Sequence, residues 1–551
     1  MNYLIGHRCQ ALLRISLVAL GASWVFAAQA AALMVANLAD SGPGSLRQAL
    51  SDNTSLGGGN TIVFSNTVTG VIPLSSAELT VAAAVNIRGP GTNLLAVSGS
   101  KSRRVFTVLA GPTQISGLTI RDGLVIGGSG GQGQDGDNGQ GGGIFNQSML
   151  TLSNCVVRNN SVVGGMGGER HLGNVGNGGG GLGGGIYNAN GNLFLINCSF
   201  DGNGATGGQG GGAVNGDAGP AGNGLGGAIY TVGGTNQITA CSLTRGLAMG
   251  GAGGVATNSG TAGSRGQGYG AGIYNESSVT VFGSTISGGS AMGGISGSGT
   301  GSGYGGGIFN GADLALNSCT IANNSVSGSS FDAGGGIYNV GTLGITNSTL
   351  AGNQADFGGG LNGNANAAGT IFAANTAGTG PDVNGTINSY DYNLLQSTAG
   401  ASVIGVTAHV IVGQNPQLGP LRNNGGPTFT MALLPGSPAI DQSKNFGFTP
   451  DQRGFPRPWD LPSVTNAGGG DGSDIGAYEF LPTPQLNIQR ANSSNVVLFW
   501  STDAPDVRLE SETNLLENWS EVTNARVYTG NQVYVTNSAA GASKFYRLSF
   551  P

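Results

Sequence analysis

The chain has 551 residues, more than one compact core usually holds, so two or three domains are expected. Only 9% of the residues are charged and 108 are glycine, which excludes collagen for lack of a three-residue period and does not fit ordinary disorder. The formal net charge of −6, with only three lysines, argues against nucleic acid as a partner. A glycine-rich chain that keeps regular apolar residues indicates a repeat architecture.

Residues 1–30 are expected to form a signal peptide. Arg8 and Arg14 give a basic start, the short apolar run 15–26 follows, and a small-x-small cleavage site ends at Ala30. The alternative is a membrane anchor, but the run is too short to span a bilayer comfortably. The sequence therefore predicts an exported protein, extracellular or at the outer cell surface, with no transmembrane segment in the mature chain.

Residues 31–125 are expected to form an N-terminal cap and the first coils of the repeat. The stretch SGPGSLRQALSDN at 41–53 predicts a short helix, with Ser45 as its N-cap and Gln48 three residues further on. Such a helix would cover the open end of the sheets, where unpaired backbone groups are otherwise exposed.

Residues 126–375 carry two alternating phrases. The first reads GGGIFN up to Asn146 and recurs with small changes. The second, such as LTLSNCVVRNN, follows each copy at a near-constant distance. Short β-branched runs are typical of strands, and units too small to bury their own apolar side must stack on their neighbours. The sequence therefore predicts an all-β fold, a right-handed parallel β-helix, in which the glycine-rich stretches of variable length become loops at one corner.

Small residues in these phrases are expected to stack into ladders, because side-chain amides can donate and accept along the stack. The cysteines have two interpretations, free buried thiols or disulfides in an oxidising compartment. Serine at equivalent positions favours free thiols, and the lack of accompanying histidines argues against a metal site. The predicted ladders are Asn146, Asn188, Asn275, Asn310 and Asn339 in the first phrase, and Cys155, Cys198, Cys241, Ser284, Cys319 and Ser348 in the second.

The glycine-rich loops leave successive coils at the same corner, so they should lie side by side. They are either flexible and solvated or an ordered second layer held by backbone hydrogen bonds. In the first loop, Asp135 and Asp137 alternate with glycine and asparagine, a weak Ca²⁺ signal that lacks the distal glutamate of an EF-hand. The five loops lie near 127–141, 164–183, 204–226, 246–270 and 291–305.

The C-terminal part differs from the repeats. Residues 376–480 gain proline and turn signals and are expected to hold the last coils and a less regular closing segment. Residues 484–551 show alternating strands such as NVVLFWS and predict a small β-sandwich, a candidate sorting or anchoring module.

The paired phrases resemble the pectin-lyase-like β-helix repeats of bacterial surface proteins, including polymorphic outer-membrane proteins. SGPGSLRQAL, NPQLGPLRNNGGPT, LLPGSPAIDQS, DQRGFPRP and DIGAYE are similar to motifs of the choice-of-anchor Q family over roughly 35–480. This resemblance implies a surface-attached β-helix protein with no established catalytic activity. Gly44 stands where the family usually has cysteine, so any disulfide role of that position is absent here. The Phe-Tyr-Arg-Leu phrase at the end resembles C-terminal modules of secreted proteins in environmental bacteria.

The fold class also contains pectate lyases and polygalacturonases, so catalysis is a second hypothesis. Such lyases need acids for Ca²⁺ and a base, and hydrolases need carboxylates that face one groove. Residues 141–375 contain no lysine and no two acids at spacing two. The main acid cluster lies outside the repeats, where ion pairs and turn caps that close the coil are the structural interpretation. The catalytic candidates are Asp451, Arg453, Asp471, Asp474 and Glu479, with Asp460 beside them.

We therefore expect a secreted or cell-surface protein with a non-enzymatic adhesin, matrix or glycan-binding role. Its expected partners are polysaccharides or cell-surface components, and Ca²⁺ is the one candidate cofactor. The alternatives are a polysaccharide lyase or glycoside hydrolase that acts on uronate-rich polymers, and a passive structural rod. A groove with clustered acids and a base on one sheet would distinguish the enzyme from the binder.

Overall fold

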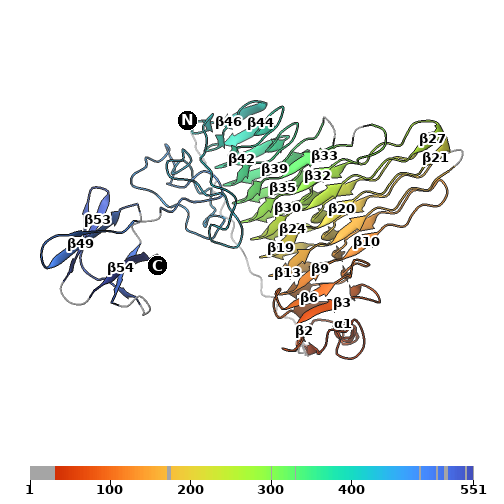
Figure 1. The fold of residues 1–551 in the computed structure, drawn as a ribbon, viewed down its shortest axis with the longest axis horizontal. Helices are drawn as coiled ribbons and strands as arrows, with labels where there is room; N and C mark the ends of the chain where they lie inside the picture. The colour runs from red at the N-terminus through yellow and green to blue at the C-terminus, as the bar shows by residue number, and fades with distance from the viewer. Residues whose placement is uncertain are drawn as a thin grey trace, which may run out of the picture.

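The computed structural model describes residues 31–170, 175–299, 301–328, 331–482, 485–503, 507–513, 519–539 and 543–549. The predicted signal peptide lies outside these residues. Within them the strands pair in parallel from coil to coil and build a long β-helix (Figure 1). The predicted fold class, an all-β parallel β-helix, is confirmed.

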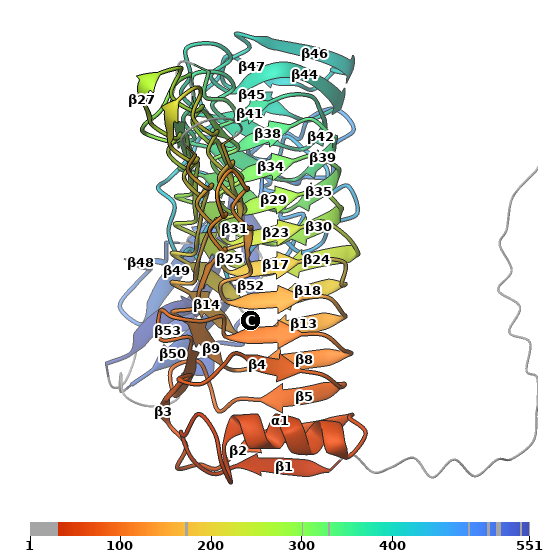
Figure 2. The same cartoon turned by 90° about the vertical axis from the view of Figure 1, so that its right-hand side faces the viewer.

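Two large sheets enclose the core. A 22-stranded sheet runs from β1 (Ala32–Val35) to β46 (Ala401–Val406), which lie at opposite ends of the stack in Figure 2. A twelve-stranded sheet forms a second side, and its middle side chains, such as Val157 and Phe200, are fully buried. Its strands are β3 (Gly70–Pro73), β6 (Leu95–Ser98), β9 (Thr119–Arg121), β14 (Val156–Arg158), β19 (Ser199–Asp201), β25 (Ser242–Thr244), β31 (Thr285–Ser287), β36 (Thr320–Ala322), β40 (Thr349–Ala351), β43 (Ile371–Ala373), β45 (Leu394–Leu395) and β47 (Ile411–Val412).

The N-terminal end of the stack carries the predicted helix, α1 (Leu46–Ser55). The Ser45 hydroxyl accepts a hydrogen bond from the backbone N–H of Gln48 at 3.1 Å, the N-cap geometry that the sequence predicts. Leu46 and Leu50 are buried in the core of the β-helix. No helix in the described part of the chain is long and apolar enough to cross a membrane.

The five asparagines of the first phrase lie in one interior ladder, and two further residues complete it. Where the repeat has Thr231 in place of asparagine, Asn188 Nδ2 donates to Asn236 Oδ1 at 2.9 Å and Thr231 Oγ1 donates to Asn275 Oδ1 at 3.0 Å. The side-chain amides therefore satisfy one another inside the core. The remaining bonds join Asn146 to Asn188 (2.6 Å), Asn275 to Asn310 (2.7 Å) and Asn310 to Asn339 (2.6 Å).

Cysteine and serine positions of the second phrase share a function, because Cys241, Ser284 and Ser348 all accept a hydrogen bond from the backbone of the preceding coil. The N–H of Cys198 donates to Cys241 Sγ at 3.3 Å, and the N–H of Cys241 donates to Ser284 Oγ at 3.0 Å. The N–H of Cys319 donates in the same way to Ser348 Oγ at 3.0 Å. The four cysteines of this ladder, Cys155, Cys198, Cys241 and Cys319, are buried free thiols.

The glycine-rich loops form an ordered layer beside the coil. We call it the glycine layer: the loops that follow β10 (Leu124–Ile126), β15 (Ser161–Val163), β20 (Gly204–Thr206), β26 (Leu247–Met249) and β32 (Ser290–Met292). Gly164 N–H donates to the carbonyl of Thr206, at the end of the next coil's β20, at 2.9 Å, and Gly165 N–H donates to the carbonyl of Asp137 in the preceding loop at 2.8 Å. In the same way, Gly167 N–H donates to Gln209 of the next loop and Gly168 N–H donates to Gln134 of the preceding loop. The three-residue period matches the three residues per turn of polyproline II.

Close packing of backbones explains why this layer is made of glycine. A Cβ on Gly164 or on Gly222 would lie 1.8 Å from the carbonyl oxygen of Gly179. Since no side chain fits at that distance, the glycine content of the loops reflects an ordered lattice of hydrogen-bonded backbones. Of the two interpretations of the loops, the ordered layer is the one that the structure shows.

The C-terminal residues form two antiparallel sheets that face each other across a small core around Trp500 and Leu509. This arrangement is the β-sandwich that the alternating pattern predicts. The β-sandwich touches residues 414–480, where the Trp459 indole N–H donates to the backbone oxygen of Asp503 at 3.2 Å. The strands are β48 (Asn487–Arg490), β49 (Asn495–Ser501), β53 (Gln532–Ser538) and β52 (Arg526–Thr529) in one sheet, and β51 (Ser520–Glu521), β50 (Arg508–Glu512) and β54 (Phe545–Ser549) in the other.

Candidate functional site

The outer face of the twelve-stranded sheet changes character along the stack. The first and third residues of each three-residue strand point outward, because successive strand residues face opposite sides. The third residues from β9 to β43 are Arg121, Arg158, Asp201, Thr244, Ser287, Ala322, Ala351 and Ala373. Charged side chains thus occupy the N-terminal coils, hydroxyls the middle, and alanine the C-terminal coils.

Residues 414–480, the closing segment, cover the part of this face that carries no charge. Gln452 bridges two coils: its Nε2 donates to Thr285 Oγ1 at 2.8 Å, and its Oε1 accepts from Thr320 Oγ1 at 2.5 Å. One coil further on, the N–H of Ala477 donates to the threonine hydroxyl of β40 at 3.1 Å. The threonines at the first outward position are therefore the contacts that seat the closing segment.

On the last coils the first outward position becomes apolar. Ile371 and Leu394 pack there against Leu433, Ile440 and Ile475 of the closing segment in a second buried core. The prediction that 376–480 closes the coil describes this region, but residues 414–480 lie along the side of the stack and do not extend beyond β46 (Figure 1).

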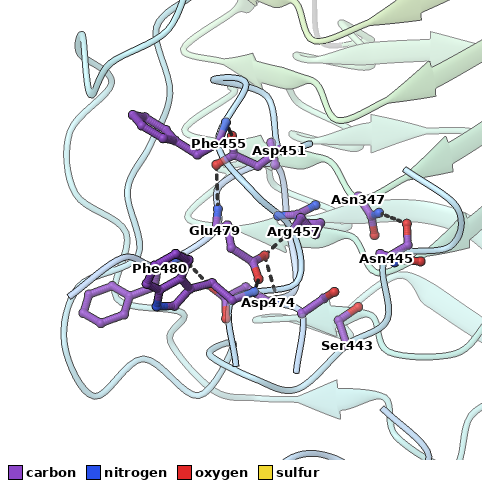
Figure 3. A network of polar contacts seen from close by, with 12 residues as sticks. Asn347, Ser443, Asn445, Asp451, Phe455, Arg457, Asp474, Glu479 and Phe480 are labelled. Atoms are coloured by element: carbon purple, nitrogen blue, oxygen red, sulfur yellow. Dashed lines mark hydrogen bonds and ion pairs between the residues drawn. The ribbon is translucent and has the colours of Figure 1, made fainter. Parts of the chain in front are cut away.

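A buried ionic network fixes the closing segment (Figure 3). Arg453 pairs with Asp451, and Arg457 pairs with Glu479, both at 2.7 Å and with side chains no more than 3% exposed. Glu479 also accepts the backbone N–H of Asp474 at 3.1 Å. Burial, helped by the neighbouring Glu479, raises the pKa of Asp474 far above its ordinary value. These charges compensate one another inside the protein.

The predicted catalytic candidates belong to this network or border it. Asp451, Arg453, Asp474 and Glu479 are buried, so a substrate in solvent does not reach them. Asp471 is exposed, but its carboxylate accepts backbone N–H groups from Asn445 and Ser473 at 3.0 and 3.1 Å, as a turn cap does. This placement fits ion pairs and turn caps that hold the closing segment.

The uncovered N-terminal coils of the same sheet form an open depression, which we call the trough. One hollow of about 420 Å³ lies over β14, β19, β25 and β31, with Phe429 of the closing segment at its border. A second, of about 520 Å³, continues around the corner past Lys101 and Asp122. The charged residues of the trough are Lys101, Arg121, Asp122, Arg158, Asp201 and Arg245.

Four cations and two carboxylates give the trough a net positive charge in an acidic chain. Arg245 holds Asp201 through two hydrogen bonds, of which the Nε–Oδ1 bond is 2.7 Å long, and this pairing lowers the pKa of Asp201. Arg121 lies 3.4 Å from Asp122. The side chains of Arg158 and Lys101 are exposed and donate no hydrogen bond to the described residues, although Arg158 lies near enough to Asp201 to help lower the pKa of that carboxyl. The hydrogen-bond donors of these two cations thus remain for a ligand.

Polar and apolar surface meets in the trough. Ser199, Ser242 and Thr244 offer hydroxyls along its floor, and the ring of Phe429 is 51% exposed at its edge. An exposed ring presents a flat apolar surface next to donors and acceptors, as sites that bind amphipathic ligands do. The arrangement can hold an anion that also carries hydroxyl groups and apolar C–H faces.

The sequence carries a signal for the trough that single residues do not show. The phrases LTIRDG, VVRNN and SFDGN place Arg121, Arg158 and Asp201 at one equivalent position. Aligning the phrases residue by residue reveals this row of stacked charged positions. The same alignment would have shown a second asparagine ladder, in which Asn160 Nδ2 donates to Asn203 Oδ1 at 3.0 Å.

The weak Ca²⁺ candidates serve the glycine layer. Asp135 Oδ1 accepts the N–H of Asn177 from the next loop at 2.7 Å. Asp137 is exposed, and its backbone joins two loops. Within the described ranges, no three His, Cys, Asp or Glu side chains gather closely enough to hold a metal ion.

The fold and the trough together define a class: a parallel β-helix protein with a cationic depression on one sheet. No family model matches the chain, and no curated protein resembles it in sequence. Among solved structures, a mannuronic acid specific polysaccharide family 6 lyase from human gut microbiota is 10% identical, with a TM-score of 0.26, over 68% of this chain and 91% of that chain. A likeness this slight carries no argument about this chain, and the choice-of-anchor Q resemblance stays a prediction.

Proposed function

We propose that this protein binds acidic polysaccharide in the trough and does not cleave it. The observation that carries the proposal is the pair of exposed cations, Arg158 and Lys101, whose side chains donate no hydrogen bond to the described residues, in an open trough of a chain whose net charge is −6. A carboxylated polymer would find hydrogen-bonding cations there, and charge-assisted hydrogen bonds are among the stronger polar contacts.

The shape of the trough favours a polymer over a small anion. Its charged residues span the strands from β6 to β25, four strand spacings or roughly 19 Å. Pockets for small ligands enclose most of the ligand surface, whereas this depression is open along its length. A chain of linked sugars that crosses the strands would meet a cation, a hydroxyl or the Phe429 ring on successive coils.

The acids of the trough favour binding over hydrolysis. A glycoside hydrolase needs a carboxyl group with a raised pKa to protonate the leaving oxygen. Arg245 instead holds the pKa of Asp201 below its ordinary value, so this carboxylate stays ionised. The other acid of the trough, Asp122, lies 3.4 Å from Arg121.

Uronate polymers are extracellular, which agrees with the proposed export of the chain to the cell surface or beyond it. The C-terminal β-sandwich is then a candidate for attachment, and the β-helix is the part that presents the trough. In this proposal the protein is an adhesin or matrix component that retains acidic glycan.

Binding should be measured by calorimetry with polygalacturonate and alginate, and with neutral dextran for comparison. We expect binding to the acidic polymers alone, weakened by salt because exposed charges are screened. Arg158→Gln should weaken it about tenfold, as loss of one charge-assisted contact does. Arg490→Gln, on an exposed strand of the β-sandwich, removes the same charge away from the trough and should leave affinity unchanged. Equal affinity of both variants would contradict the trough assignment.

Catalysis needs a separate measurement. The same polymers, with and without Ca²⁺, should be assayed for new reducing ends and for unsaturated products. We expect neither. Turnover that Arg158→Gln abolishes would overturn the non-enzymatic proposal and keep the trough as the site, whereas binding without turnover supports it.

A further inference from the structure

The C-terminal end of the β-helix is open. β46 pairs with β44 (Val383–Tyr390) over six residue pairs, and no other described strand pairs with it. Figure 2 shows β46 as the last strand of the stack. Its second edge therefore presents free backbone N–H and C=O groups, a template for another strand.

The side chains at this end are apolar and incompletely covered. Ile404 and Val406 on β46 are 51% and 54% exposed, and Val412 on β47 is 51% exposed. On the core side, Val403 and Val410 pack against the main core but stay partly accessible. Among the described residues no helix or strand covers the core at this end, in contrast to the N-terminal end, which α1 covers.

The end also lacks the features that usually prevent pairing between copies. From residue 392 to residue 421 the chain contains no Asp, Glu, Lys or Arg, and from 392 to 415 no proline. Exposed edges in natural proteins usually carry charges, prolines or bulges that block association. An uncharged, β-branched edge repels no second copy of itself.

The terminal coil is also held in place. His409 donates its backbone N–H to Asp391 Oδ1 at 2.8 Å, and its Nδ1 lies 2.7 Å from Asp391 Oδ2. The Tyr392 ring stacks on the imidazole at 4.9 Å between centroids. Because the edge is already ordered, a partner does not have to order it on binding, which lowers the entropic cost of association.

We infer that a second copy of this chain docks on this end, with two β46 strands antiparallel across a two-fold axis near Ile404. That register places Ser402 opposite Val406 and Val403 opposite Gly405, so outward residues meet outward residues and the two cores join. A two-fold interface is closed, so assembly stops at a dimer. The trough lies on the side of each copy and stays accessible.

Sedimentation equilibrium of the purified protein tests this inference. We expect a monomer–dimer equilibrium, and Ile404→Lys should raise the dissociation constant about a hundredfold, because two lysines would face each other across the axis. Val340→Lys is the matched control: Val340 is 63% exposed in a turn in the middle of the stack, and dimerisation should persist. A wild-type protein that stays monomeric, or a dimer that survives Ile404→Lys, would overturn the inference.

A cross-link tests the geometry. Opposite residues of an antiparallel pair have Cα atoms about 4.5–5.5 Å apart, within disulfide range. Ile404→Cys should therefore join to its own copy under mild oxidation, whereas Val340→Cys should not. Head-to-tail stacking would give assemblies larger than dimers and no bond between equivalent cysteines, which would exclude the two-fold arrangement.

Discussion

The two halves of the twelve-stranded sheet share a backbone and differ in what faces outward. β14 and β36 have the same length, the same parallel pairing and the same kind of inward side chain, Val157 in one and Ile321 in the other. Outward, β14 ends in an exposed arginine and β36 in a buried alanine. The inward positions thus build the scaffold, and the outward positions alone decide whether a coil is covered or free to bind.

The largest effect is expected from the buried ionic network of the closing segment. Arg457→Met would leave Glu479 buried without its partner, which typically costs about 3–5 kcal/mol. Urea unfolding should show this loss, and limited proteolysis should show cleavage within 414–480. Arg245→Gln removes an exposed pair of the trough and should cost at most about 1 kcal/mol. Similar losses for both variants would show that the closing segment is not held by its buried charges.

Exchanging outward residues between the halves tests the comparison directly. Ala322→Asp copies Asp201 into the covered half, where the carboxylate would be buried without a cation, and should cost about 3 kcal/mol. The reverse change, Asp201→Ala, copies the covered half into the trough and should alter stability by less than about 1 kcal/mol. Unfolding free energies of the two variants provide the measurement. Equal losses of unfolding free energy in the two variants would mean that the outward residues do not decide whether the closing segment covers a coil.

A smaller effect is expected from Gln452, whose side-chain amide joins the closing segment to Thr285 and Thr320 on neighbouring coils. Gln452→Leu keeps the size of the side chain but leaves Thr285 and Thr320 without their buried partner, at a cost of about 1–3 kcal/mol. Hydrogen exchange should then increase in the closing segment and not in the coils below β31. Uniform exchange along the whole stack would contradict a local role for this glutamine.

A last prediction concerns pH. Burial, together with nearby Asp460, Glu479 and Asp503, raises the pKa of Asp441 from 3.8 to about 7. Between these values the folded state binds more protons than the unfolded state, so stability falls as pH rises from about 4 to about 7, by at most about 1.4 kcal/mol per pH unit from this group. Asp441→Asn should reduce this slope, as measured by urea midpoints across the range. A slope unchanged by Asp441→Asn would contradict the assignment.

The coil could be predicted from the sequence because its signals are local and repeated. The isoleucine of each first phrase fixes the register, and Ile144, Ile186 and Ile229 pair in successive coils. Ser45 and Gln48 likewise predict the cap of α1 from four neighbouring residues. Periodic apolar residues and short-range caps depend on contacts that the sequence itself repeats.

The cover and the trough could not be predicted in the same way. Gln452 meets Thr285 across 167 positions of sequence, and neither residue belongs to a periodic pattern that indicates the contact. The buried acids of 451–479 looked like candidates because their spacing shows neither their burial nor their arginine partners. The trough depends on how far the closing segment covers the sheet. Phe429 lies at the border of this cover, and that border exists only in three dimensions.

The glycine layer gives the molecule two kinds of thermal behaviour. Unfolding of apolar surface raises the heat capacity, and unfolding of polar backbone lowers it. The coil encloses the large apolar core, whereas the layer is joined mainly by backbone hydrogen bonds, such as those from Gly208 N–H to Gly179 and from Gly179 N–H to Gly165. Hydrophobic stabilisation weakens on cooling, so the coil loses strength towards low temperature while the layer does not. At low temperature we therefore expect the glycine layer to resist unfolding better than the coil.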